Sequence, residues 1–231
     1  MLVVESQPQS KIAGVLFDLD NTLVPRKGWL RRVFKEFYKA TPLLRASRSE
    51  EEVCSRLIEW DNDGDVDRAS LYARALKAWP EIGGTPSEWV DWETQAIGSA
   101  IEPDDEVLLF LARLREFQIP WGIVTNGGAR QRLKLAAAKL DGITPFSLVS
   151  SECGMRKPEP AIFREAMRRL GLVPAETVLF VGDDPDNDIV GAQGVGMATA
   201  WVRRGRQYPH GMPAPNMLID RVNDLRPVLL Q

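Results

Sequence analysis

Residues 14–23 read Gly-Val-Leu-Phe-Asp-Leu-Asp-Asn-Thr-Leu, a short apolar run that ends abruptly in two carboxylates. The apolar part, residues 15–17, is typical of a strand buried on both faces of a sheet. Asp18 and Asp20 follow this strand directly, at a point where an unpaired charge is costly. If the extended backbone continues, side-chain alternation aims both carboxylates to the same side. The stretch therefore predicts a buried strand that delivers a pair of acids to a site.

Three more polar motifs follow in order along the chain. They are Ile123-Val124-Thr125-Asn126-Gly127, Arg156-Lys157-Pro158 and Val181-Gly182-Asp183-Asp184, the last running on to Asn187-Asp188. Clustered carboxylates repel one another unless a cation or a shared proton holds them, so the acidic clusters indicate a metal. A threonine hydroxyl and a lysine between them suit a bound phosphate. Together the motifs predict phosphoryl chemistry with Mg²⁺, because oxygen ligands without histidine favour Mg²⁺ over zinc.

The sequence around these motifs alternates between strand-like and helix-like segments. Alternating strands and helices predict an α/β fold, a parallel sheet with helices on both faces. All four motifs come at or just beyond the ends of expected strands, where open α/β sheets place their ligand sites. The expected strands are residues 15–17, 121–124, 148–150, 178–181 and 198–202, and the expected helices are residues 106–117, 129–140, 161–170 and 186–193.

Residues 26–102 have a different hydrophobic pattern, with helical periodicity and no convincing strand. Five of the seven tryptophans fall here, enough to build a small apolar core. We interpret the segment as an all-helical domain inserted after the first strand, which leaves residues 1–25 and 103–231 for the α/β domain. The helices expected in the insertion are residues 30–39, 50–59, 68–79 and 88–100.

The composition of the 231-residue chain is that of an ordinary globular protein, with 44% hydrophobic and 26% charged residues. A formal net charge of −3 gives no indication of the excess positive charge that binding to nucleic acid or to an acidic membrane surface requires. No apolar run reaches the length of a membrane span, and the first residues do not resemble a secretory signal. The cytoplasm is the expected location, a small molecule is the expected partner, and monomer and homodimer both stay open.

Two further patterns are interpreted as surface features. Residues 59–64, Glu-Trp-Asp-Asn-Asp-Gly, hint at a calcium loop, but Ser70 stands where such a loop needs its bidentate acid. We therefore expect a solvated turn. The arginine pairs at 31–32 and 203–204 are expected to be surface charge. The single histidine, His210, argues against chemistry that depends on an imidazole base.

As an ordered set, the motifs resemble the haloacid dehalogenase superfamily in its phosphatase branch. The pattern Asp18-x-Asp20-x-Thr22, Thr125, Lys157 and Gly182-Asp183-x-x-x-x-Asp188 covers the chain from residue 12 to about residue 200. The resemblance implies a Rossmann-like core, and it makes residues 26–102 the helical cap of the arrangement called C1. Residues 151–160 are also similar to the phosphoglycolate phosphatase-like group, a likeness that does not fix a substrate.

The resemblance further implies Mg²⁺-dependent hydrolysis of a small phosphorylated metabolite through an aspartyl-phosphate. Asp18 would attack phosphorus and hold the metal. Asp20 would protonate the leaving alcohol and then deprotonate the attacking water. The implied metal residues are Asp18, Asp20 (through its main-chain carbonyl), Asp183 and Asp188, the last directly or through a water. The implied phosphate-binding residues are Thr22, Thr125, Asn126 and Lys157, of which Thr125 and Lys157 also count as catalytic.

Four other classes of protein share parts of this pattern. A dehalogenase of the superfamily needs neither Asp20 nor the acidic fourth motif, so the sequence argues against it. A phosphomutase would share every catalytic residue and stays open. A signalling receiver domain also uses Asp, Thr and Lys around Mg²⁺, but its acidic pair and its phosphoacceptor lie on separate strands. An inactive binding protein fits poorly, since no expected catalytic residue is missing.

Overall fold

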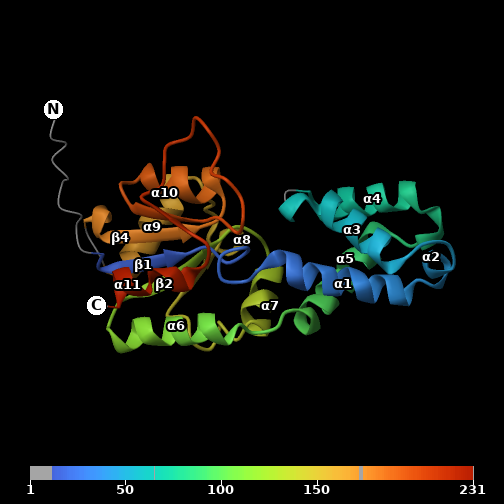
Figure 1. Cartoon of the computed structure of the whole chain (residues 1–231), viewed down its shortest axis with the longest axis horizontal. Helices are drawn as coiled ribbons and strands as arrows, with labels where there is room; N and C mark the ends of the chain where they lie inside the picture. The colour runs from blue at the N-terminus through green and yellow to red at the C-terminus, as the bar shows by residue number, and fades with distance from the viewer. Residues whose placement is uncertain (1–11, 65, 172–173, 231) are drawn as a thin grey trace. The chain divides into compact units, whose positions relative to one another are not determined.

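The computed structural model describes residues 12–64, 66–171 and 174–230. The chain divides into two compact units (Figure 1). The first unit comprises Met1–Leu23, Asp104–Gln131 and Gly142–Gln231, and the second comprises Val24–Pro103 and Arg132–Asp141. A search of the described residues for a helix both long and apolar enough to span a bilayer finds none.

The first unit is built on a parallel sheet of six strands in the order β3-β2-β1-β4-β5-β6. The strand that carries the first motif, β1, lies inside the sheet between β2 and β4. This arrangement confirms the predicted α/β fold. The strands are β1 (Gly14–Phe17), β2 (Trp121–Thr125), β3 (Ser147–Val149), β4 (Val178–Gly182), β5 (Ala198–Val202) and β6 (Met217–Ile219).

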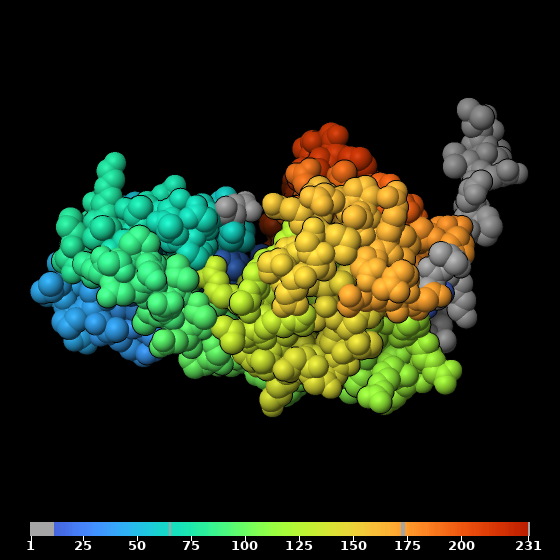
Figure 2. Space-filling view, turned by 180° about the vertical axis from the view of Figure 1, so that it is seen from behind, coloured from blue at the N-terminus to red at the C-terminus, as the bar shows by residue number. Residues whose placement is uncertain are grey.

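Helices cover both faces of this sheet, because neighbouring strand residues point in opposite directions. Leu16 belongs to a buried cluster with Ile162 and Phe163 of α9. Phe17, the next residue, contacts Phe110 of α6 edge-on with ring centroids 6.2 Å apart. The outer face of α9, which is polar, forms part of the yellow to orange surface in Figure 2. The helices of this unit are α6 (Asp105–Glu116), α7 (Arg130–Ala137, which continues into the second unit), α8 (Ser150–Cys153), α9 (Pro160–Leu170), α10 (Gly191–Gln193) and α11 (Arg226–Leu229), with short turns η3 (Ala175–Thr177), η4 (Pro185–Val190) and η5 (Val222–Leu225).

Two features of the first unit differ from the sequence-based expectation. Strand β6 was not predicted, because it has only three residues and lies at the edge of the sheet, where Leu218 is 53% exposed. The helix expected over residues 186–193 is a wide π-helical turn, η4, followed by the short α10. Both differences arise where local sequence patterns are short.

The second unit is all-helical over its described residues. Its helix starts are set by side chains that accept main-chain N–H groups, since Ser49, Asp67 and Thr85 cap three of the helices. Residues Arg132–Asp141 also fall in this unit, although the sequence analysis assigned residues 129–140 to the α/β domain. The elements are α1 (Arg26–Ala40), α2 (Pro42–Ser47), α3 (Glu50–Asp61), η1 (Asn62–Gly64), α4 (Arg68–Ala78), η2 (Pro80–Ile82) and α5 (Pro86–Ala100).

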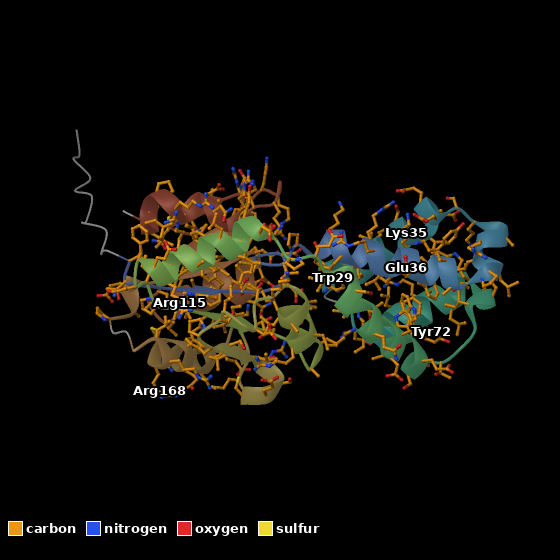
Figure 3. The ribbon with its side chains drawn as sticks, turned by 90° about the horizontal axis from the view of Figure 1, so that it is seen from below. Trp29, Lys35, Glu36, Tyr72, Arg115 and Arg168 are labelled. Carbon is orange, nitrogen blue, oxygen red and sulfur yellow. The ribbon has the colours of Figure 1, made fainter. Side chains whose placement is uncertain are left out.

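Aromatic side chains fill the core of the second unit. Trp89 is buried and contacts Phe37 and Tyr72 at ring-centroid distances of 4.7 and 5.9 Å. Trp29 is also buried, and its ring contacts the guanidinium of Arg26 and the ammonium of Lys134 at centroid distances of 5.2 and 5.3 Å. Figure 3 labels Trp29 and Tyr72 on this unit. The tryptophans counted in the sequence thus contribute to an apolar core, with Trp60 and Trp92 only half-buried.

A buried ionic network joins four helices of the second unit, α1, α3, α4 and α5. Asp61 is fully buried and accepts hydrogen bonds from Arg26 at 2.8 and 2.9 Å and from Arg68 at 2.5 Å. Arg68 also donates to Glu93 at 3.0 Å. The prediction of a solvated turn over residues 59–64 is therefore wrong for Asp61, because partners distant in sequence neutralise its charge.

Candidate active site

The carboxyl edge of the sheet brings the four motifs together in the first unit. Phe17 and Val181 are register partners in β1 and β4, so Asp18 and Asp183 emerge from adjacent strands. The main-chain N–H of Asp18 donates to the Val181 carbonyl at 2.9 Å and fixes this alignment. Neighbouring parallel strands end at one edge, so the topology alone places these acids side by side.

Three buried carboxylates form a compact cluster at this edge. One oxygen each from Asp18, Asp183 and Asp188 can be chosen so that all lie within 4.8 Å of one another. Gly182 makes the close approach possible, because a Cβ at this position would collide with the Asp188 side chain. Hard oxygen donors at this spacing suit a divalent cation such as Mg²⁺, so these residues could hold a metal.

Lys157 is the positive charge within the cluster. Its Nζ lies 2.6 Å from Oδ1 of Asp18 and 2.6 Å from Oδ1 of Asp188, and its side chain is only 3% exposed. The Asn126 side chain holds the Lys157 backbone at both ends: it donates to the Lys157 carbonyl at 2.9 Å and accepts from the Lys157 N–H at 2.9 Å. The Asn126 side-chain amide therefore positions the lysine.

The electrostatics of the cluster favour binding of a further cation. Burial raises the pKa of Asp183 to about 7, and the neighbouring Asp188 adds to the effect. Burial likewise raises the pKa of Asp18 and of Asp188, although Lys157 opposes the shift. Burial alone would lower the pKa of Lys157, but Asp18 and Asp188 outweigh it and raise that pKa above its usual value. Three carboxylates face two cations, Lys157 and the Arg206 guanidinium that donates to Asp183, which leaves an excess of negative charge that a metal would offset.

Asp20 lies apart from the cluster of three acids. Its side chain is half-buried, and its Oδ2 accepts a hydrogen bond of 3.0 Å from Nε2 of Gln131. The same Gln131 nitrogen lies 2.5 Å from Oγ1 of Thr125, at the end of β2. Asp20 and Thr125 are therefore linked through one amide group.

Two further residues of the motifs, Thr22 and Asp184, border the cluster of acids in the sequence. The Thr22 hydroxyl, which the resemblance implies as a phosphate ligand, is buried without a hydrogen-bond partner among the described residues. Asp184 caps η4, accepting from the N–H groups of Asp186 and Asn187 at 2.9 and 3.0 Å. One surplus acid of the fourth motif thus has a capping role.

Sequence reasoning missed three residues that border the site. Gln131 links Asp20 to Thr125, as described above. Arg204 donates to the main-chain carbonyls of Asn21 and Thr22, so the expectation that it is surface charge is wrong. Arg206 donates to Oδ2 of Asp183 at 2.8 Å. No local sequence pattern identifies these residues, since each reaches the site from a helix or loop outside the motifs. The one signal in the sequence that could have indicated them is that they are polar and lie near strands that carry motifs.

The match to known proteins agrees with this geometry. Residues 12–196 match the family model described as haloacid dehalogenase-like hydrolase. The chain is 33% identical over 229 residues to glyceraldehyde 3-phosphate phosphatase of Methanopyrus kandleri, covering 94% of this chain and 97% of that protein. It is 32% identical over 224 residues to phosphoglycolate phosphatase of Photorhabdus laumondii, covering 93% and 91% of the two proteins.

A solved structure shows the same fold. The putative hydrolase YfnB of Bacillus subtilis, solved bound to magnesium, superposes with a TM-score of 0.75 at 19% identity, covering 96% of this chain and all of that one. The fold and the family match thus define a hydrolase with a Rossmann-like parallel sheet and a carboxylate cluster at the sheet edge. This chain belongs to the haloacid dehalogenase-like hydrolase family, and its curated relatives place it in the phosphatase branch.

Proposed function

We propose that this protein is a Mg²⁺-dependent phosphomonoester hydrolase that acts on a small phosphorylated metabolite through an aspartyl-phosphate on Asp18. The observation that supports this most strongly is the arrangement of Asp18, Asp183 and Asp188 around Lys157. A dianionic ester cannot approach these carboxylates unless cations offset their charge. The family membership supports the same chemistry.

In the proposed reaction Asp18 attacks the phosphorus atom. Lys157 holds Oδ1 of Asp18 at 2.6 Å and thereby fixes the direction of the carboxylate. When bound, Mg²⁺ would be held by Asp18, Asp183 and Asp188 and would neutralise charge on the phosphoryl oxygens. The Asp20 main-chain carbonyl is proposed as a further ligand. Thr125 and the Asn126 main-chain N–H, with Lys157 and with Thr22 as a further candidate, are proposed to bind the phosphoryl group.

Asp20 is proposed to move the protons. It would protonate the leaving alcohol when the ester bond breaks, and as a carboxylate it would then take a proton from the water that hydrolyses the aspartyl-phosphate. Its half-buried side chain fits this alternation, since the attacking water has to reach the carboxylate in the second step. Neither step requires an imidazole.

The substrate class is proposed from the site and from the relatives. The relatives named above act on glyceraldehyde 3-phosphate and phosphoglycolate, two small phosphorylated carbon compounds. The residues of the site recognise only features that all phosphate esters share. We therefore propose a small phosphorylated metabolite and leave the individual ester to measurement.

The test is a panel of small phosphate esters assayed for phosphate release. Activity is expected with Mg²⁺, should vanish with EDTA and should return when Mg²⁺ is restored. Ca²⁺ should support it poorly, because its larger shell lets Asp18 bind through both oxygens and lose its attacking position. Full turnover in metal-free buffer, or no phosphate release from any ester, would contradict the proposal.

A further inference from the structure

Gln131 lies among the motifs without belonging to any of them. The residue is only 3% exposed, and Nε2 donates to Asp20 Oδ2 at 3.0 Å and to Thr125 Oγ1 at 2.5 Å. An amide nitrogen carries two hydrogens and accepts none, so these two bonds use its full capacity. One neutral side chain therefore connects the proposed acid–base to a proposed ligand of the phosphoryl group.

The contact with Gln131 decides how the Thr125 hydroxyl can act. A hydroxyl donates one hydrogen and can accept others. Because the Gln131 nitrogen only donates, Thr125 Oγ1 must be the acceptor, and its own hydrogen has to point elsewhere. That hydrogen has a weak acceptor in the Asn126 carbonyl oxygen, at 3.5 Å. It can therefore turn toward an anionic oxygen placed at the end of β2.

The loop after β2 is shaped to admit the glutamine. Gly127 has a φ of +145°, and a Cβ at this position would lie 2.8 Å from Cγ of Gln131. Only a residue without a side chain leaves this space free. The main-chain N–H of Gln131 donates to the Gly128 carbonyl at 2.9 Å, which fixes where the side chain starts. Loop and glutamine thus fit each other.

We propose that Gln131 is a positioning residue that holds the Asp20 carboxylate beside Thr125 and directs the Thr125 hydroxyl toward the phosphoryl group. This inference rests on the proposed function and adds a residue to its machinery. Without Gln131, the Asp20 carboxylate would lose the hydrogen bond that ties it to Thr125. The Thr125 hydroxyl could then donate its hydrogen bond to a neighbouring acceptor instead of to the phosphoryl group.

The experiment compares Gln131→Met with Gln193→Met. Methionine keeps the length of the side chain and removes both donors. Gln193 is a matched control, because its Nε2 also donates to a threonine hydroxyl, Thr199 at 3.2 Å, and to the Ala214 carbonyl at 2.8 Å. Thr199 lies in β5 near its amino end, away from the carboxyl edge of the sheet. Thermal unfolding shows that each variant is folded, and Gln131→Glu, nearly identical in shape, serves as a second variant.

Three measurements separate positioning from a merely structural role. For Gln131→Met, kcat on an alkyl phosphate should fall about 100-fold and kcat on an aryl phosphate less than tenfold, because only the poor leaving group needs a well-placed acid. Inhibition by inorganic phosphate should weaken by about fivefold, the value of one hydrogen bond. In a protein that already carries Asp20→Asn, adding Gln131→Met should change the ratio of alkyl to aryl phosphate turnover little further. The reason is that each substitution alone acts on proton donation by the Asp20 carboxyl.

Equal losses on both esters with unchanged phosphate binding would overturn the proposal, as would the same selective loss in Gln193→Met. The test also distinguishes this inference from the proposed function. Turnover by the wild-type protein tests the proposed function alone. Binding of inorganic phosphate in the presence of Mg²⁺, measured by calorimetry, needs no turnover. Weaker phosphate binding by Gln131→Met therefore supports the role of Gln131 even if the wild type hydrolyses none of the esters. Unchanged phosphate binding contradicts that role.

Discussion

Arg206 donates to Oδ2 of Asp183 at 2.8 Å and to the Asp183 main-chain carbonyl at 2.9 Å. The same carbonyl accepts the indole N–H of Trp201 at 2.8 Å, and the guanidinium lies over the Trp201 ring. The Asp183 carbonyl therefore has a second donor, Trp201, besides Arg206. The arginine adds a positive charge directly beside a carboxylate that we propose as a metal ligand.

We predict that Arg206→Gln binds Mg²⁺ more tightly than the wild type. The substitution removes a cation that competes for Asp183, and one charge at short range in a wet environment changes Kd by about 3- to 10-fold. The measurement is calorimetric titration with Mg²⁺. Arg203→Gln is the matched control, because Arg203 pairs with Asp220 instead and should bind Mg²⁺ as the wild type does. Weaker binding by Arg206→Gln would show that the arginine orients Asp183 for the metal.

Asp18→Asn should lower turnover more than about 1,000-fold, the scale seen when a nucleophile is removed. The amide cannot attack phosphorus, and the fold should persist because Lys157 keeps Asp188 as a partner at 2.6 Å. Phosphate release and circular dichroism measure the two effects. Asp186→Asn is the control, an exposed acid of the same motif as Asp188 that lies outside the cluster. Substantial activity in folded Asp18→Asn would exclude Asp18 as the nucleophile.

Asp20→Asn should separate proton transfer from nucleophilic attack. Activity on alkyl phosphates should fall by about 100- to 10,000-fold, the usual size of general acid catalysis. Activity on an aryl phosphate should fall less, since a phenolate leaves without a proton. The comparison requires kcat for both ester types from one preparation. A parallel loss on both would assign Asp20 to the metal or to the fold.

Asp61→Asn should destabilise the second unit by about 3–5 kcal/mol, because a buried charge network loses one partner. Arg26 and Arg68 both depend on Asp61, at 2.8 and 2.5 Å. Thermal and urea unfolding measure the loss. The neighbouring Asp63 is exposed, so Asp63→Asn should change the free energy of unfolding little. A neutral effect of Asp61→Asn would mean that the network contributes no net stability.

The same aspartate predicts a pH dependence. Burial would raise the pKa of Asp61, but Arg26 and Arg68 outweigh it and hold that pKa below its usual value of 3.8. A depressed folded-state pKa gives stability that is present above the unfolded-state pKa and is lost as pH falls through the folded value. The gap in unfolding free energy between wild type and Asp61→Asn should therefore narrow below about pH 4.

The helical unit is expected to select the substrate, because the phosphoryl-binding residues recognise what all esters share. Near the start of α1, Arg26 and Trp29 are buried, whereas Lys27 is exposed, as is Asp63 in the turn η1; we therefore take Lys27 and Asp63 as the candidates. Lys27→Ala and Asp63→Asn should shift the preference among esters by more than they slow an aryl phosphate. Lys77→Ala, an exposed lysine near the end of α4, is the control. A uniform loss on all esters would contradict this role.

The sequence by itself determined the α/β fold and the residues that the sheet edge collects. Buried strands are short apolar runs, and polar residues that follow them must meet where parallel strands end. For this reason Asp18, Lys157, Asp183 and Asp188 could be named in advance, and the structure brings them together. Strand β6 escaped prediction because an edge strand of three residues carries little local signal.

Tertiary structure alone decided which other charges join these residues and which are buried elsewhere. Arg204 and Asp61 both looked like surface residues, yet one binds the carbonyls after Asp20 and the other is enclosed by two arginines. Gln131 carries no motif and still reaches Asp20, 111 positions earlier in the chain. Periodicity records which face of an element is buried, whereas the partner of a polar side chain depends on how distant segments pack, which no local pattern contains.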